Sequence, residues 1–142
     1  MTLGVNLCQG QGPRDMESEG VVVLSDFKQL IVWQKAMDLA VQNYRLIKQL
    51  PGQERFALAD QPRRAAISVP SNIAEGYARK TTNEYVQFLH IAKGSNAELQ
   101  TQLLLSVRIG YFTDAQIESC MCLSGEIAKM ISAIILKLSS HT

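Results

Sequence analysis

Residues 81–116 read TTNEYVQFLHIAKGSNAELQTQLLLSVRIGYFTDAQ and contain two helix starts with one helix end between them. Thr81 and Thr113 each stand three residues before a Glu or Gln, which is the spacing of a capping box. Between the two boxes apolar residues recur at helical spacing, and Gly110 follows as a helix terminator. The stretch predicts one helix over about 81–109 and a second helix that begins near 113.

The same helical spacing continues on both sides of this stretch. Downstream, we expect a helix from Thr113 to about Leu138. Upstream, we expect a helix from about Ile31 to the turn at Pro51-Gly52. Its apolar stripe is formed by Trp33, Met37, Ala40, Tyr44 and Ile47. We interpret Trp33 as a core or interface anchor.

The remaining helix is expected to begin near residues 53–56 and to reach Arg79 or Lys80. Pro62 would lie in its first turns, where a missing N–H costs little. Pro70 lies deeper and should kink the helix, or alternatively break it into two pieces.

Four long helices joined by short turns lie antiparallel in chain order. We therefore predict an all-α, antiparallel up-down-up-down four-helix bundle over residues 27–142, a length that suits one domain. Residues 1–26 are Gly-rich and lack periodicity, and we expect them to be a flexible N-terminal leader.

Charge divides the chain at the same boundary. Residues 1–26 contain one Arg and four Asp or Glu, a formal charge of −3. Residues 27–142 contain thirteen Lys or Arg and nine Asp or Glu, a formal charge of +4, so the expected bundle is mildly basic. The sequence has no run of about 18 apolar residues and no secretory signal, so we predict no membrane span and a cytoplasmic location.

Polar residues of the second expected helix fall on one stripe, at steps of four, four and three: Arg64, Ser68, Asn72 and Glu75. The third helix offers a counterpart in Ser95, Glu98 and Gln102. A fully solvated face more often carries Lys and Glu than Ser and Asn. We therefore expect a partly buried polar seam. In it, Arg63 or Arg64 pairs with Glu75 or Glu98. The seam either sets packing or is a ligand or nucleic-acid site.

The second helix is also dense in small side chains, which let another backbone approach closely. These residues are Ala65, Ala66, Ser68, Ser71, Ala74, Gly76 and Ala78. They predict a tight contact between helices, either inside the bundle or between subunits.

Cations cluster at the ends of the second helix, and we take four as candidate phosphate contacts: Arg63, Arg64, Arg79 and Lys80. Most such clusters are simply solvated surface. Repetition around a symmetric oligomer would strengthen the field, because each copy adds phosphate contacts.

Catalytic and metal-binding patterns are weak in this sequence. Cys120 and Cys122 stand two apart with no His nearby, which is a poor zinc motif. There is no Gly-rich phosphate loop, and we expect no metal, no cofactor and no catalytic residues. His90 is interpreted as a helix-surface residue. The least favoured alternative is an enzyme that uses Glu75 and Glu98 as paired carboxylates.

Four segments together are similar to one known family. They are Val32-Trp33-Gln34-Lys35-Ala36, Gln61-x-Arg63-Arg64-Ala65-Ala66-x-Ser68, Asn72-Ile73-Ala74-Glu75-Gly76 and Ala92-Lys93-Gly94-Ser95-x-x-x-Glu98-Leu99. The chain from Phe27 to Leu138 resembles the small four-helix-bundle proteins encoded by intervening sequences within bacterial large-subunit ribosomal RNA genes. That family is sometimes labelled a ribosomal protein, and it is structurally related to the accessory variability proteins of diversity-generating retroelements. Pro62 departs from the pattern, which usually has an aliphatic residue there.

The resemblance implies a bundle that assembles into a ring, commonly a homopentamer, and it implies no known enzymatic activity. The retroelement relatives contact nucleic acid and bind a reverse transcriptase. The resulting hypothesis is a non-enzymatic homo-oligomeric scaffold that binds RNA, DNA or a nucleic-acid enzyme such as a reverse transcriptase. The alternative is a protein-binding adaptor without nucleic-acid contact, whose small-residue face receives a partner helix.

Overall fold

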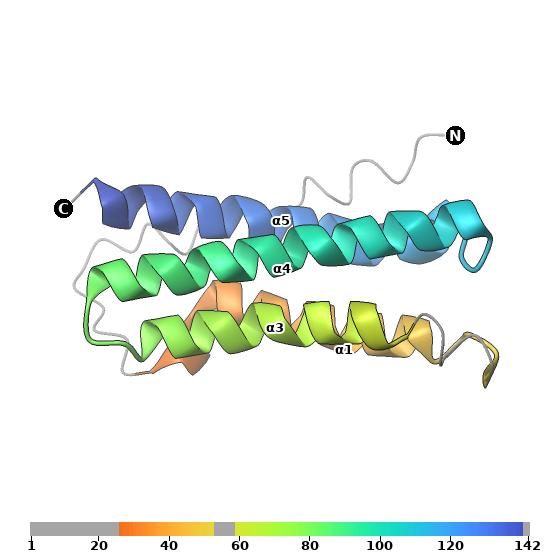
Figure 1. Cartoon of the computed structure of the whole chain (residues 1–142), viewed down its shortest axis with the longest axis horizontal. Coiled ribbons are helices and arrows are strands. Elements are labelled where there is room, and N and C mark those ends of the chain that lie inside the picture. The colour runs from red at the N-terminus through yellow and green to blue at the C-terminus, as the bar shows by residue number, and fades with distance from the viewer. Residues whose placement is uncertain (1–25, 53–58, 141–142) are drawn as a thin grey trace.

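The computed structural model describes residues 26–52 and 59–140, and these residues form helices and no strand. The short 3-10 helix η3 (Phe27–Gln29) is followed by α1 (Ile31–Ile47), α3 (Asp60–Tyr77), α4 (Thr82–Ile109) and α5 (Asp114–Ser139). The four long helices lie side by side, and successive helices run in opposite directions (Figure 1). The prediction of an all-helical four-helix bundle is confirmed. The expected leader up to residue 25 lies outside the described residues.

Each long helix packs against two others, in the order α1, α3, α4, α5 and back to α1. This arrangement has four lateral faces, one for each neighbouring pair of helices. The α5/α1 face is closed by polar contacts, including an ion pair of 2.6 Å between Lys35 Nζ and Glu126 Oε1. The faces therefore differ in chemistry, and the α1/α3 and α3/α4 faces carry the features described below.

The predicted boundaries of α4 and the start of α5 are confirmed at the level of individual hydrogen bonds. Thr81 Oγ1 accepts from the backbone N–H of Glu84 at 3.2 Å. Thr113 and Gln116 form a complete capping box, in which each side chain accepts from the other residue's backbone N–H. Gly110 ends α4 in the left-handed region, with φ of 96°.

The second expected helix differs from the prediction at both ends. The helix α3 begins at Asp60, and the expected start at residues 53–56 lies outside the described residues. The helix ends at Tyr77, short of Arg79 and Lys80. Pro62 is the third residue of α3, where its missing N–H has no helical acceptor in any case. Pro70 lies inside one continuous helix, so the alternative of two separate pieces is wrong. Buried neighbours hold the backbone helical, because tertiary packing outweighs local propensity.

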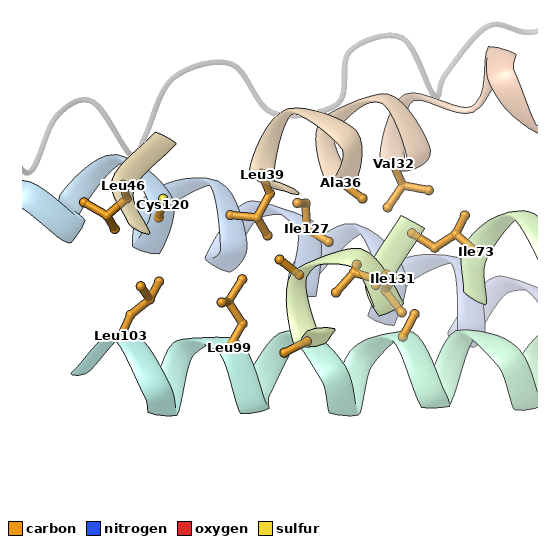
Figure 2. Packing of buried hydrophobic residues seen from close by; sticks show 14 of the residues in the cluster. Val32, Ala36, Leu39, Leu46, Ile73, Leu99, Leu103, Cys120, Ile127 and Ile131 are labelled. Carbon is orange, nitrogen blue, oxygen red and sulfur yellow. The ribbon is translucent and has the colours of Figure 1, made fainter. Parts of the chain in front are cut away.

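The core is aliphatic and receives side chains from all four long helices. Figure 2 shows Leu39, Ile73, Leu99 and Ile127 pointing into the same interior space. The main members of the core are Val32, Ala36, Leu39, Leu46, Leu50, Ala65, Ala66, Val69, Ile73, Leu89, Ala92, Leu99, Leu103, Phe112, Ile117, Cys120, Ile127, Met130 and Ile131.

The apolar stripe predicted for the first helix is only partly right. Ile47 is buried, and Trp33 and Ala40 are partly buried and pack against the core. Met37 and Tyr44 are 41% and 52% exposed. The stripe that faces the core is instead formed by Val32, Ala36, Leu39, Asn43, Leu46 and Ile47. Helix α1 thus carries two adjacent apolar stripes, and periodicity does not show which of them is covered.

One described helix, α5, is long and apolar enough to span a membrane by length and composition. A core helix of a soluble bundle passes the same test, and α5 places Ile117, Ile127 and Ile131 in the core. The finding is therefore weak evidence for a membrane segment.

Candidate functional site

The centre of the α3/α4 contact is a small polar cluster. The hydroxyl oxygens of Ser68 and Ser95 lie 2.7 Å apart. Asn72 Nδ2 donates to both the hydroxyl and the backbone carbonyl oxygen of Ser68, each at 2.8 Å. Because the Ser68 oxygen accepts from Asn72, its own hydrogen is available for Ser95. The structure therefore brings together three of the predicted seam residues, all of them partly buried.

The predicted arginine–glutamate pairs of the seam are not what the structure shows. Arg64 is exposed and pairs with Asp60 at 3.3 Å, and Glu75 pairs with Arg79 at 3.0 Å. Both pairs join residues four apart in the sequence, so each arginine finds a carboxylate one turn away without crossing to α4. On α4, Glu98 accepts from Gln102 Nε2 at 3.1 Å. The charged members of the seam are thus exposed, whereas Ser68, Asn72, Ser95 and Gln102 are partly buried.

The small residues of α3 are used mainly inside the bundle. A Cβ added at Gly76 would lie 2.6 Å from Phe88 Cβ, so the two helices touch at backbone distance there. Ala65 and Ala66 are buried in the core. Exposed or partly exposed members remain on the α1 side, where Ser71 and Ala74 line a surface hollow.

A buried polar network between α4 and α5 was missed by the sequence analysis. Asn96 Nδ2 donates to the carbonyl oxygen of Ser124 at 2.8 Å, and Ser124 Oγ donates to Asn96 Oδ1 at 2.6 Å. Gln100 Nε2 donates to the same hydroxyl at 2.8 Å. Asn96 stands four residues after Ala92 and three before Leu99, so its place on the apolar stripe was the available signal.

The α1/α3 face, in contrast, is an open apolar groove. Two adjoining hollows of about 540 and 380 Å³ share Met37, Ala40 and Ile67 as lining residues. Met37, Val41, Tyr44 and Ile67 expose between 41% and 52% of their surface along it. We call this surface, from Trp33 to Lys48 on α1 and from Arg63 to Ala74 on α3, the α1/α3 groove. An apolar strip that is open to solvent is a candidate binding surface.

One end of the α1/α3 groove is basic and aromatic. Arg45, Lys48 and Arg63 line it together with Tyr44, and the Lys48 ammonium lies 5.7 Å from the centre of the Tyr44 ring. Arg45 and Lys48 were missed as site residues, because they belong to the first helix and its end, and only the fold brings them beside Arg63. An exposed tyrosine among cations is a suitable surface for phosphates and stacked bases.

Two polar atoms in the wall of this basic end have no partner within the described structure. Asn43 is 1% exposed and its Nδ2 donates to the carbonyl oxygen of Pro62, but its Oδ1 accepts nothing. The buried Nε of Arg63 likewise donates to nothing. An unpaired buried acceptor and donor each carry a free-energy cost of about 1–3 kcal/mol.

The four predicted cations do not form a single patch. Arg63 and Arg64 lie at the start of α3, whereas Arg79 and Lys80 follow its end, roughly 24 Å away at 1.5 Å per residue. Arg79 lies over the Phe88 ring, with 4.9 Å between the guanidinium carbon and the ring centre. Any nucleic acid that contacts all four must therefore run along the helix or reach several copies of the chain.

The arrangement does not support the use of Glu75 and Glu98 as paired carboxylates. Gly76 lies opposite Phe88, so Glu98 is about ten residues further along α4 than Glu75, roughly 15 Å at 1.5 Å per residue. Within residues 26–52 and 59–140 no three His, Cys, Asp or Glu side chains are grouped to hold a metal ion. His90 is exposed on α4. Burial raises the pKa of the Cys120 thiol to about 11, which makes it a poor nucleophile at neutral pH.

The fold and this surface define a small antiparallel helical bundle with an apolar groove and a basic rim. The chain belongs to the 23S rRNA-intervening sequence protein family, whose model matches residues 28–133. A solved structure of a protein of unknown function from the S23 ribosomal protein family of Bacteroides thetaiotaomicron is similar to it. The two are 30% identical with a TM-score of 0.70, and the match covers 74% of this chain and 98% of that chain. No curated protein matches this chain.

Proposed function

We propose that the protein is a non-enzymatic scaffold whose copies assemble into a ring, a homopentamer, in the cytoplasm. The ring binds nucleic acid, or a nucleic-acid enzyme such as a reverse transcriptase, and needs no cofactor. The observation that carries the nucleic-acid part is the convergence of Arg45, Lys48 and Arg63 with the exposed Tyr44 at one end of the bundle. The reverse transcriptase remains an analogy with the retroelement proteins, since fold alone does not fix function.

Ring assembly is what would make a modest basic cluster effective. One copy offers few phosphate contacts, and each exposed cation adds little free energy by itself. Copies related by a closed rotation repeat the same cluster at regular spacing, so their contacts with one nucleic acid add together. The ring also joins the two separated cation pairs, at the two ends of α3, into two circular rows.

Fluorescence anisotropy with structured RNA and duplex DNA, at low and high salt, tests this proposal. We expect Arg45→Glu/Lys48→Glu to weaken binding about tenfold or more, and to reduce the salt slope by about 0.9 for each phosphate that is no longer neutralised. The matched control is Lys129→Glu/Lys137→Glu, which makes the same change of charge on exposed positions of α5. Equal weakening in both variants would show that total charge matters and that the site is misplaced.

Wild-type protein that shows no binding at low salt would reject the nucleic-acid part altogether. The ring is tested separately by the mass of the protein in solution. A monomeric mass at micromolar concentration contradicts the assembly, whatever the binding data show.

The apolar groove favours a second candidate, a protein-binding adaptor that receives a partner helix between α1 and α3. Apolar side chains one turn apart on a partner helix would fit beside Met37 and Ile67, as in other helix-in-groove complexes. A pull-down after nuclease treatment separates the two candidates. A specific protein partner whose binding is lost in Ile67→Asp and kept in Arg45→Glu/Lys48→Glu supports the adaptor.

A further inference from the structure

The two ends of the α1/α3 groove differ in polarity and charge. The part nearest the start of α1 is apolar and lined by Trp33, Met37 and Ile67. The part nearest the end of α1 is lined by Arg45, Lys48 and Arg63. A suitable occupant therefore has an apolar part followed by an acidic part, in that order away from the start of α1.

A segment of this chain outside the described residues has that order. Residues 15–24 read DMESEGVVVL, with the acids at the far end and the apolar residues nearest the bundle. In an extended segment alternate side chains share one face. The odd-numbered face carries both kinds of group: Asp15, Glu17, Glu19, Val21 and Val23.

The starting point of the segment is fixed at the mouth of the groove. Asp26 caps η3 by accepting from the backbone N–H of Lys28 at 2.7 Å. The helix η3 contacts both α1 and α3, and the Phe27 ring lies edge-on to Trp33, with 5.2 Å between ring centres. The chain that precedes Asp26 therefore begins beside the apolar part of the groove.

The segment before Asp26 is long enough to reach the basic part of the groove. The distance along α1 from Trp33 to Lys48 is roughly 22 Å at 1.5 Å per residue. An extended chain covers about 3.3 Å per residue, so Val23 and Val21 lie about 10 and 17 Å from Asp26. By the same rise Glu19 lies about 23 Å away, level with Lys48, and Glu17 lies about 30 Å away, just beyond it.

We propose that residues 15–24 bind in the α1/α3 groove of the same chain as an extended segment, with Val21 and Val23 on the apolar part and Glu17 and Glu19 beside Arg45, Lys48 and Arg63. The proposal requires neither nucleic acid nor an assembled ring.

The test uses Trp33, the single tryptophan of the chain, which lines the groove. Acrylamide quenching of its fluorescence reports how open the groove is, and the quencher is uncharged. We compare Val21→Asp/Val23→Asp with the matched control Val22→Asp/Leu24→Asp, in the full chain at one protein concentration. Both variants add the same charge to the same segment, and they differ only in which face they change.

We expect quenching of Trp33 to rise about twofold to fivefold in the odd-face variant, the factor that corresponds to about 0.5–1 kcal/mol of weaker binding in the groove. The even-face control should remain near the wild type. The second part of the experiment reverses the charges of the leader and of the groove. Glu17→Lys/Glu19→Lys should open the groove, and combining it with Arg45→Glu/Lys48→Glu should close it again.

Equal quenching in the odd-face and even-face variants overturns the proposal. So does quenching that depends on protein concentration while all leader variants behave alike, because the occupant is then a second copy of the chain. Thermal melts of each variant confirm that the bundle remains folded.

Discussion

Gly76 and Gly94 are both helical glycines, yet their surroundings differ completely. A Cβ at Gly76 would lie 2.6 Å from Phe88 Cβ and 3.1 Å from Tyr85 Cδ1. At Gly94 nothing lies within 4 Å of that position. Phe88 Cβ is bonded directly to the backbone and cannot rotate away, so a methyl group at Gly76 would push α3 and α4 apart.

We predict opposite effects of alanine at these two glycines. Gly76→Ala should lower the free energy of unfolding by about 1–3 kcal/mol, the usual cost of overpacking. Gly94→Ala should raise it by about 0.5–1 kcal/mol, because alanine is the better helix former and has free space there. Urea denaturation of both variants measures the two changes. A neutral or stabilising Gly76→Ala would show that the two helices are further apart than described.

Single residues also mark the limit of what the sequence predicted. Thr81, Thr113 and Gly110 were placed correctly, because a cap depends on residues within one turn of itself. Asn43 and Asn96 were not recognised as buried, although both stand on apolar stripes. Their amides are stabilised by groups on other helices, and such partners are not visible in a linear pattern.

At the scale of elements, α1 shows why helical periodicity was insufficient. Its two apolar stripes have similar spacing, and the sequence favoured the one that contains Trp33 and Tyr44. The structure buries the other stripe and leaves Tyr44 exposed on the groove, whereas Trp33 lines the groove and also packs against the core. The type and order of the helices could thus be predicted from the sequence, whereas the face each helix buries depends on its neighbours.

The candidate site was predicted to a similar extent. Ser68, Asn72 and Ser95 lie together as expected. Arg64 does not join them, because Asp60 is one turn away on its own helix. The groove and its basic end were not predicted, since they combine residues of α1 and α3 that are about twenty positions apart.

The Asn96 network gives a prediction for the α4/α5 pair. Asn96→Ala removes both hydrogen bonds to Ser124 and leaves a small cavity, so we expect the free energy of unfolding to fall by about 2–4 kcal/mol. Gln100→Ala removes one bond at the partly buried edge and should cost about 1 kcal/mol. Chemical denaturation at a fixed protein concentration separates the two. Equal decreases would mean that the buried amide has no special role.

The stability of the whole molecule should depend on alkaline pH. Desolvation, with a smaller contribution from neighbouring Tyr77, raises the pKa of Tyr85 from 10.0 to about 12. Burial raises the pKa of Cys120 from 9.0 to about 11. Both groups are neutral when protonated, so a raised pKa favours the folded state below the unfolded pKa. That contribution is lost as pH rises through the folded pKa.

We therefore expect the contribution of Tyr85 and Cys120 to the free energy of unfolding to be constant below about pH 9. The contribution should fall between about pH 9 and 12. Tyr85→Phe should flatten the part of the decline above pH 10. Denaturation midpoints measured across this pH range decide the matter. A decline that is identical in Tyr85→Phe and in the wild type excludes Tyr85 as its source.

The unequal packing on the two sides of α3 also affects how the bundle can respond when a ligand or partner binds. On one side, Gly76 places α3 against α4 with no room for either helix to approach further. On the other side, the groove between α1 and α3 is lined by side chains that are half in solvent. We therefore expect a change in the width of the groove to come from movement of α1 rather than of the α3–α4 pair.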